Sequence, residues 1–426
     1  MDANSTPGTC SYCEQQGAVF SIEEVASEVA RVIEKFYLLV DNGDGEETSE
    51  IIGQWVCDAA VMDIDCALGD FWFDRDSLTS VFGDDPRFKR HIFSGLDWTR
   101  EWGPTPMEDK WDAMERSLKY ASRYVNSTVA STLSEFFGPV SDDVTQEGLP
   151  VVINAGPGQS ISELYRARVF QETSTLETAL RHPERELGAP PAGKGSAGRM
   201  NAPGISVFYA ATHPDVAIAE VRPPVGAMVT VAKFRIQRKL KLLDLTRFAE
   251  MGFRFDNLFD RRTEERALRV QFARKLVSLL SLPVMPDRAS EEYLVTQAIA
   301  DFLASSDDLD LDGLVLESTQ VNGEKFANER NVILFSKAAR VFDADAERGD
   351  TVDVRLWEFG DGQAHLEPVL SALTRRHNSI LDASARDPRD MTLSLNFREI
   401  EVRTVVAVEF ISFQHGLRFK ETQGVN

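Results

Sequence analysis

Residues 207–245 read VFYAATHPDVAIAEVRPPVGAMVTVAKFRIQRKLKLLDL, and this stretch decides the fold class. Three short runs within it are rich in β-branched, aromatic and other apolar residues: Val207 to Ala210, Met228 to Phe234 and Leu240 to Leu245. Prolines, glycines and charged residues separate these runs, as is typical of strands joined by loops. We therefore expect the three runs to be strands of a sheet.

On the C-terminal side, helical and strand patterns alternate. Apolar residues recur with helical spacing at 264–281 and 290–304. The expected strands are 313–316, 332–335, 352–359, 391–397 and 402–413. Strands interleaved with helices predict a mixed α/β domain followed by extra C-terminal strands.

On the N-terminal side, the sequence predicts helices. Ser21 and Glu24 have the spacing of a capping box, and apolar residues then follow on one helical face to about residue 40. A second helix is predicted over 108–137, before Gly138 and Pro139. Its expected apolar stripe is Trp111, Met114, Leu118, Tyr124, Val125, Val129, Leu133 and Phe136.

These patterns predict an α+β protein with four segments. The first is a helical domain over 1–140, and the second is a linker over 141–160 that contains Gly156-Pro157-Gly158. The main mixed α/β domain is expected over 161–345. A β-rich extension over 346–426 is expected to pack on it.

The charge of the chain excludes general binding to polyanions. Its 426 residues include 46 basic and 68 acidic ones, which gives a formal net charge of −22. So negative a surface repels nucleic acids and anionic membranes, although a local basic pocket can still bind a small anion. We expect no nucleic-acid partner and no membrane partner.

Targeting signals and cysteine usage point to the cytoplasm. The first ten residues, MDANSTPGTC, have no basic start followed by an apolar run, so we expect no secretory signal. We also expect no membrane-spanning helix, because no apolar stretch is long enough. Four cysteines in a chain of this length do not make a disulfide framework.

Two glycine motifs and one cysteine motif carry little weight. Gly193, Gly195 and Gly198 match GxGxxG, but the preceding residues, Gly188-Ala189-Pro190-Pro191, are not a buried strand. Gly188, Gly193 and Lys194 have the offsets of a P-loop, but Gly195 stands where that motif has the magnesium-binding Ser or Thr. Cys10 and Cys13 form a CxxC pair, which Cys57 and Cys66 could complete as a structural zinc site; their spacing favours four ordinary thiols instead. The scattered histidines support no catalytic metal.

Several separated motifs between about 165 and 342 share one order and spacing. They are Tyr165-Arg166-Ala167-Arg168, Gly198-Arg199-Met200-Asn201, Phe208-Tyr209-Ala210-Ala211, Ala217-Ile218-Ala219-Glu220-Val221-Arg222, Leu242-Leu243-Asp244-Leu245-Thr246, Thr296-Gln297, Asp312-Gly313-Leu314-Val315-Leu316-Glu317-Ser318 and Asn331-Val332-Ile333-Leu334-Phe335. This order resembles the RES domain, a family named for a recurrent arginine, glutamate and serine.

The resemblance implies an ADP-ribosyltransferase-like fold that binds NAD and cleaves its nicotinamide–ribose bond, in many members as the toxin of a toxin–antitoxin pair. It implies NAD and, in several members, inorganic phosphate as substrates, with no tightly bound cofactor. The implied catalytic residues are Glu220, Ser318 and Tyr209. The implied NAD-binding residues are Arg166 in the first strand, Arg199 and Asn331.

The chemistry of these residue types suits that reaction. A carboxylate near the ribose stabilises an oxocarbenium-like transition state, which is the role expected of Glu220. Guanidinium groups bind pyrophosphate in bidentate fashion, as expected of Arg166 and Arg199, and Tyr209 offers an aromatic face to the nicotinamide. Glu317, beside Ser318, is the alternative carboxylate. Taken singly, each of these residues is more often a surface or core residue.

The front of the chain, from Cys10-Ser11-Tyr12-Cys13 onward, resembles the HEPN-like helical domains that precede some RES domains. Ribonucleases of that class use an arginine separated from a histidine by about four to six residues. Here His91 follows Arg87 and Arg90 at spacings that do not fit. A regulatory or scaffolding helical unit is therefore expected.

Three functions follow from the sequence. The first is NAD cleavage by phosphorolysis or hydrolysis, in a bacterial toxin or defence effector. The second is transfer of ADP-ribose to a protein, and the third is nucleotide sensing without turnover. Restraint by an antitoxin-like partner or by the helical domain is expected for the enzymes, and homo-oligomerisation is left open.

Overall fold

The computed structural model describes residues 6–9, 16–19, 38–39, 98–99, 106–252, 261–281, 289–318, 320, 326, 328–342, 351–360, 363–373 and 389–408. The chain divides into two compact units. Unit 1 comprises Met1–Ile153 and Leu243–Asp310, and unit 2 comprises Asn154–Leu242 and Leu311–Asn426. This division into two units does not test the four segments expected from the sequence, which stay a prediction.

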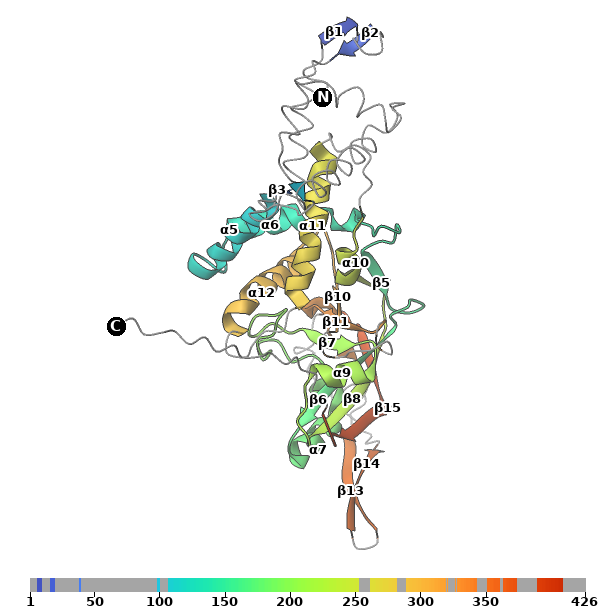
Figure 1. Ribbon diagram of the computed structural model, residues 1–426. Coiled ribbons are helices and arrows are strands. Elements are labelled where there is room, and N and C mark those ends of the chain that lie inside the picture. Colours follow the sequence, from blue (N-terminus) through green and yellow to red (C-terminus); the bar gives the residue numbers. More distant parts are fainter. Residues whose placement is uncertain are drawn as a thin grey trace, which may run out of the picture. The chain divides into compact units, whose positions relative to one another are not determined.

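Unit 1 is built mainly from helices in its described residues (Figure 1). They are α5 (Pro106–Tyr120), α6 (Ser127–Phe137), the 3-10 helix η1 (Gly138–Asp142), α10 (Leu245–Ala249), α11 (Arg261–Ser281) and α12 (Ala289–Ser305). Four short strands precede them: β1 (Thr6–Thr9), β2 (Gln16–Val19), β3 (Leu38–Leu39) and β4 (Trp98–Thr99). Most of the helix predicted at 21–40 lies outside the described residues, and its last part was wrong, because Leu38–Leu39 form β3.

The single helix predicted over 108–137 was also wrong, because two helices form there. Asn126 has an extended backbone, and its side chain accepts a hydrogen bond from the Val129 amide at 3.2 Å, so it caps a new helix. Tyr124 and Val125, expected in the apolar stripe, are 98% and 90% exposed. Of the other six residues of the stripe, Trp111, Met114, Leu118, Leu133 and Phe136 are buried as predicted, and Val129 is half-buried.

Aromatic rings form the centre of unit 1. Phe136 contacts Phe137, Phe248 and Phe272 with ring centroids 4.8, 5.6 and 5.1 Å apart, in edge-to-face geometry. Because α6, α10 and α11 supply these rings, α10 and α11 share a core with α6, which lies more than 100 residues earlier in the chain.

A buried ion pair lies beside this aromatic core. Arg269 on α11 donates from Nη1 to Asp143 Oδ1 at 2.8 Å and from Nε to the Phe136 carbonyl at 2.7 Å. Its Nη2 lies 2.6 Å from Asp143 Oδ2, and the two side chains are only 10% and 8% exposed. The pair ties α11 to the end of α6 and to the residue that follows η1.

Unit 2 contains most of a mixed sheet. Among the described residues this sheet has nine strands, in the order β12-β15-β8-β6-β7-β11-β10-β9-β5. Their bounds are β5 (Val152–Ala155), β6 (Glu163–Phe170), β7 (Phe208–Ala211), β8 (Met228–Ile236), β9 (Leu240–Asp244), β10 (Gly313–Glu317), β11 (Arg330–Leu334), β12 (Val341–Phe342) and β15 (Leu393–Thr404). The strands β13 (Thr351–Gly360) and β14 (Gln363–Leu373) form a separate hairpin.

Short helices accompany the sheet of unit 2 (Figure 1). They are α7 (Thr173–Arg181), α8 (Pro183–Glu186), α9 (Pro214–Glu220) and the 3-10 helix η3 (Ser336–Ala338). The predicted strands at 207–210, 228–234, 240–245, 313–316 and 332–335 are confirmed within one or two residues at most ends. One continuous strand, β15, replaces the two predicted at 391–397 and 402–413, and the part of the second beyond 408 lies outside the described residues.

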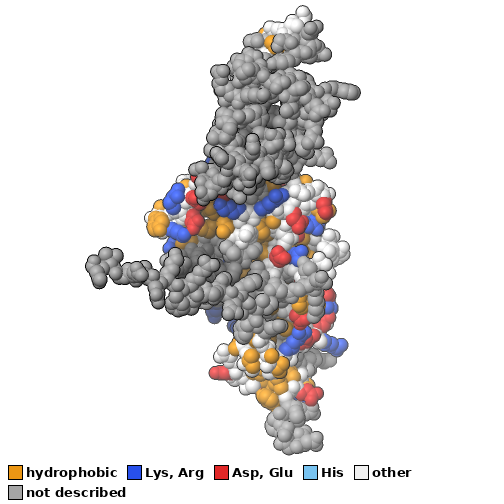
Figure 2. Space-filling model, in the orientation of Figure 1, with side chains coloured by type: hydrophobic (Ala, Val, Ile, Leu, Met, Phe, Trp, Pro, Cys, Tyr) orange, Lys and Arg blue, Asp and Glu red, His pale blue; other side chains and the backbone are white. Residues whose placement is uncertain are grey.

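The predicted α+β class is confirmed, with helices on the N-terminal side and a large mixed sheet. The ADP-ribosyltransferase-like arrangement and the HEPN-like domain stay predictions. On the face shown in Figure 2, acidic and basic side chains of the described residues are interspersed. No described helix has the length and apolar character needed to cross a membrane.

The buried ion pair gives a first prediction. Asp143→Ala leaves the Arg269 charge buried without its partner, which typically costs about 3–5 kcal/mol. We expect this loss in the opening free energy of the α6 and α11 amides, measured by hydrogen exchange of the full chain. As a control, Glu135→Ala removes the exposed partner of Lys110 and should change little. Equal effects of the two substitutions would show that burial of the Arg269 pair does not matter.

Candidate functional site

The helix α9 begins with a set of residues suited to a helix N-terminus. The side chain of His213 caps it, with Nδ1 accepting from the Asp215 amide at 3.2 Å. Pro214 occupies the first turn, where a missing N–H costs nothing, and the Asp215 carboxylate complements the helix dipole. The helix ends at Glu220, and Pro223-Pro224 prevent its continuation.

The apolar side of α9 fixes the helix against the sheet. Val216 and Ala217 are buried in a cluster with Ala167 of β6, Ala211 of β7, and Val229 and Val231 of β8. These small side chains allow the helix to approach the strands closely. Glu220, the last residue of the helix, is consequently held at this face of the sheet.

Three residues predicted from the sequence meet at the end of α9. Glu220 Oε1 accepts hydrogen bonds from Ser318 Oγ at 2.9 Å and from Asn331 Nδ2 at 2.7 Å. We call Glu220, Ser318 and Asn331 the Glu220 cluster. The register explains the meeting, because Asn331 of β11 lies opposite both Ala211 of β7 and Leu316 of β10, so these three side chains share one face.

In the Glu220 cluster, a carboxylate lacks a described cationic partner and an amide oxygen lacks a hydrogen-bond donor. Ser318 is 8% exposed, whereas Glu220 is exposed. Among the described residues no cation forms an ion pair with Glu220. Asn331 Oδ1 is buried without a hydrogen-bond partner. The cluster therefore offers an uncompensated carboxylate and a buried acceptor beside it.

Tyr209 and the Gly198–Asn201 turn form a second group. Tyr209 Oη donates to Asn201 Oδ1 at 2.8 Å and accepts from the Met200 amide at 3.0 Å. A Cβ at Gly198 would lie 2.7 Å from Tyr209 Oη, so the close approach requires glycine. The phenol therefore holds the turn that presents Arg199, a structural role which sequence reasoning did not identify.

The side chain of Asn201 holds the backbone of this turn together, a role that the sequence analysis did not predict. It is 3% exposed, and its Nδ2 donates to the carbonyls of Ser196 at 2.8 Å and Ile205 at 3.1 Å. Its place in the Gly198-Arg199-Met200-Asn201 motif was the available signal. Arg199 itself is half-buried.

The structure does not bring Arg166 to the Glu220 cluster. Tyr165 pairs with Ala211, so Arg166, the next residue of β6, points to the opposite face of the sheet. There its guanidinium carbon lies 5.0 Å from the centre of the Phe208 ring. Its Nη1 is buried without a hydrogen-bond partner. Burial, together with the nearby charge of Arg168, lowers the pKa of Arg166 to about 10.

Glu317, the alternative carboxylate, lies on the other side of β10 from the cluster. Residues alternate along a strand, so Glu317 and Ser318 point to opposite faces. Glu317 is exposed and pairs in register with Arg330. The geometry consequently favours Glu220.

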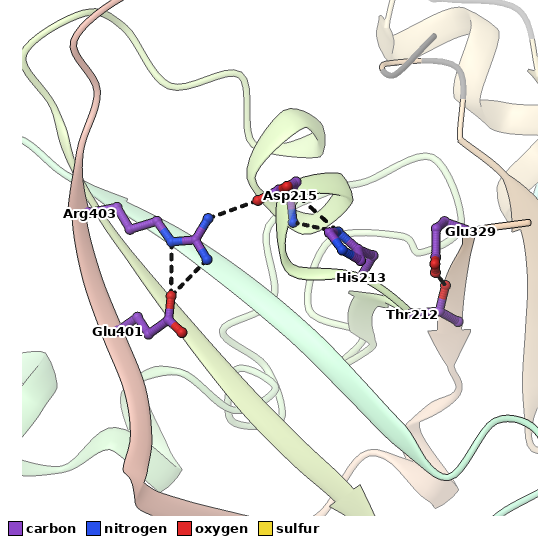
Figure 3. A network of polar contacts seen from close by, with 6 residues as sticks. All are labelled: Thr212, His213, Asp215, Glu329, Glu401 and Arg403. Atoms are coloured by element: carbon purple, nitrogen blue, oxygen red, sulfur yellow. Dashed lines mark hydrogen bonds and ion pairs between the residues drawn. The ribbon is translucent and has the colours of Figure 1, made fainter. Parts of the chain in front are cut away.

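Sequence reasoning also missed the polar residues at the start of α9, shown in Figure 3. Asp215 Oδ1 accepts from Arg403 Nη1 at 2.8 Å, and Thr212 Oγ1 donates to Glu329 Oε2 at 2.5 Å. The His213-Pro214-Asp215 pattern is a recognisable N-terminus signal. Nothing in the sequence links it to Arg403, which is 188 residues away.

In the described part of the chain, no group of three or more His, Cys, Asp or Glu residues could hold a metal ion. The zinc candidates Cys10, Cys13, Cys57 and Cys66 lie outside the described residues, as do Arg87, Arg90 and His91.

Comparison with known families gives a match over part of the chain. Residues 163–357 match the family model described as the RES domain. No curated protein and no solved structure matches the chain. The matched region contains all six residues predicted for the site and ends before β15.

The unpaired Arg166 donor gives a second prediction, Arg166→Met. A buried donor without a partner costs about 1–3 kcal/mol, and the cation–π contact that would be lost contributes about 0.5–2 kcal/mol. We expect the free energy of unfolding of the ligand-free protein, measured in urea, to stay level or rise by about 1 kcal/mol.

Arg168→Met is the matched control for Arg166→Met on the same strand. Its guanidinium is 49% exposed and already contacts Glu186, so its loss should change stability little. A large destabilisation by Arg166→Met would instead identify Arg166 as a residue on which the stability of the fold depends.

Proposed function

The chain belongs to the RES domain family, and we propose that it cleaves the nicotinamide–ribose bond of NAD, with phosphate or water as the acceptor. The observation that carries this proposal is the Glu220 carboxylate, which two neutral donors hold in place and no described cation neutralises. Its negative charge is thus available to a positive charge that develops on a bound ligand.

The proposed step fits the geometry of the Glu220 cluster. The bond between ribose C1′ and the nicotinamide nitrogen breaks, and nicotinamide leaves as a neutral molecule with the bonding electron pair. The ribose ring then carries oxocarbenium character, which the Glu220 carboxylate stabilises. A phosphate or water oxygen forms the new bond to C1′; water gives up a proton, and the products are ADP-ribose 1-phosphate or ADP-ribose.

The neighbouring residues have proposed roles that follow from their donors and acceptors. Ser318 and Asn331 orient Glu220, and the unpaired Asn331 Oδ1 can accept a hydrogen bond from a ribose hydroxyl. Arg199, presented by the turn that Tyr209 holds, is proposed to bind the pyrophosphate. Arg166 points to the opposite face of the sheet from Glu220, so we do not propose that it binds the same pyrophosphate. The ring of Tyr209 is proposed to contact the nicotinamide.

The residues expected at the family's functional positions are all present in this sequence, so nothing at those positions would keep the enzyme inactive. Unrestrained cleavage of NAD would then be toxic to the cell. We propose that an antitoxin-like protein or the N-terminal helices restrain the enzyme. Comparing NAD levels in cells that express the full chain with and without neighbouring genes tests for such a protein.

Product analysis tests the activity itself. Pure protein is incubated with NAD, with and without phosphate, and nicotinamide, ADP-ribose and ADP-ribose 1-phosphate are resolved by mass spectrometry. Free ADP-ribose or its phosphate supports the proposal and identifies the acceptor. ADP-ribose attached to added protein would replace it by protein ADP-ribosylation, and NAD binding without any product would replace it by sensing.

Glu220→Gln gives a third prediction. The substitution keeps the shape and the acceptor for Ser318 but removes the charge, so turnover should fall more than NAD affinity. Loss of one transition-state interaction of this kind costs about 100-fold to 1,000-fold in rate. The measurements are kcat and calorimetric NAD affinity, with circular dichroism to check folding.

Glu317→Gln is the matched control, because this exposed carboxylate lies on the opposite face of β10. It should keep near-normal turnover. If instead Glu317→Gln is inactive while Glu220→Gln retains activity, the proposed role passes to Glu317.

Arg199→Ala gives a fourth prediction. Because it removes a proposed pyrophosphate contact, it should weaken NAD binding itself, in contrast to Glu220→Gln. Calorimetric titration of NAD into the folded variant measures this. Unchanged affinity would exclude Arg199 from pyrophosphate binding.

A further inference from the structure

The strand β15 lies beyond the region that matches the family, yet it is part of the same sheet as the Glu220 cluster. It pairs antiparallel with β8 over two stretches, at 393–395 and at 400–404. Residue 405 continues the contact: the Gly226 amide donates to the Val405 carbonyl at 2.8 Å and the Val405 amide to the Ala227 carbonyl at 3.0 Å. The end of β15 therefore runs beside the segment that leads out of α9.

An irregularity in β15 turns its last residues toward α9. Between Leu395 and Ile400 the strand advances five residues while β8 advances two, from Phe234 to Ala232. An offset of this odd size reverses which residues face each side of the sheet. Glu401 and Arg403 consequently lie opposite Val231 and Val229, on the face that α9 covers.

Arg403 connects β15 to the first turn of α9 (Figure 3). Its Nη1 donates to Asp215 Oδ1 at 2.8 Å. Its Nε and Nη2 donate to Glu401 Oε2 at 2.9 and 2.7 Å, which fixes the plane of the guanidinium. Arginine forms such a three-donor arrangement with two carboxylates, and lysine, with its single ammonium, cannot reproduce it.

A second connection joins the start of α9 to β11. Thr212 Oγ1 donates to Glu329 Oε2 and accepts from the Arg330 amide at 2.9 Å. Arg330 directly precedes Asn331 of the Glu220 cluster. The residues that begin α9 are thus attached on one side to β15 and on the other to the strand that carries Asn331.

The position of Glu220 depends on these attachments because α9 is short. Its seven residues make about two turns, which have little stability of their own. Its two buried side chains, Val216 and Ala217, are small, so a rotation of the helix loses little packing. Glu220 follows Asp215 by five residues, so a displaced first turn displaces the carboxylate.

We propose that Arg403 is a positioning residue that sets the place of the Glu220 carboxylate through Asp215 and α9. This inference rests on the proposed function, in which Glu220 acts on NAD. It makes the C-terminal strand, which lies outside the matched family region, a part of the active domain.

The test is Arg403→Gln in the full chain. A small displacement of a reacting group lowers the rate by up to about 100-fold, and we expect kcat to fall about 10-fold while KM for NAD stays within about 2-fold. The amides of residues 215–221 should exchange with solvent faster. Arg403→Lys should show an intermediate loss of kcat, since it keeps the charge without the planar donors.

The matched control is Arg235→Gln, which also removes an arginine that connects β8 with β15. Arg235 Nη2 lies 2.7 Å from Glu399 Oε1, and the side chain is 42% exposed, against 38% for Arg403. Arg235 belongs to the other stretch of the strand pairing, opposite Ser394, and Glu399 lies in the irregular segment between the two stretches. Arg235→Gln should therefore leave kcat and the exchange of residues 215–221 unchanged.

A double-mutant cycle tests the route through Asp215. Asp215→Asn should lower kcat about as much as Arg403→Gln, and the double variant should lose no more than either alone. Independent losses that multiply would overturn the inference, as would a normal kcat with unchanged exchange in Arg403→Gln. Equal kcat losses in the Arg403 and Arg235 variants would show that Arg403 contributes only to the general stability of the sheet.

The exchange measurement separates this inference from the proposed function. If the unaltered chain cleaves no NAD, the proposed function fails. Faster exchange of residues 215–221 in Arg403→Gln, but not in Arg235→Gln, would still support the positioning of α9. If NAD is cleaved but neither exchange nor kcat responds to Arg403, only the positioning role fails.

Discussion

Glu220 Oε1 accepts hydrogen bonds from residues 98 and 111 positions later in the chain, and the geometry of the site depends on this junction. It requires β10 and β11 to be neighbours in a register that places Leu316 opposite Asn331. A slip of one residue would turn Asn331 to the other face of the sheet. It also requires α9 to cross the strands, which the small residues Ala167, Ala211 and Ala217 permit.

Local patterns in the sequence predicted the elements that support this junction. The runs at 207–210, 228–234, 313–316 and 332–335 are strands because each is apolar and bounded by loop-forming residues, and the helices at 261–281 and 289–305 follow from apolar spacing. The helix expected over 108–137 fails at one residue, Asn126, whose side chain caps a new helix. A cap inside an apolar pattern is easily overlooked, since the pattern continues on both sides of it.

The sequence predicted three residues that meet in the candidate site, but it predicted only part of the site's geometry. Glu220, Ser318 and Asn331 do meet, but Arg166 points to the opposite face because it follows Tyr165 by one residue, a distinction that needs the strand pairing. Tyr209 was expected as an aromatic face, whereas its hydroxyl also holds the Gly198–Asn201 turn. Arg403 reaches Asp215 only because β15 shifts its register, and register shifts leave no local signal in a sequence.

The ligand-free domain retains polar atoms that folding alone does not satisfy. Arg166 Nη1 and Asn331 Oδ1 are buried without partners, and leaving such groups unpaired costs stability. The chain as a whole carries a charge of −22, so an anionic dinucleotide is repelled except where local cations oppose that field. A half-buried guanidinium, such as that of Arg199, attracts an anion more strongly than a fully exposed one, because the lower local dielectric strengthens the attraction. Under the proposed function, the ligand-free domain leaves Asn331 Oδ1 unpaired at a cost in stability, and a ribose hydroxyl that donates to this oxygen recovers that cost on binding.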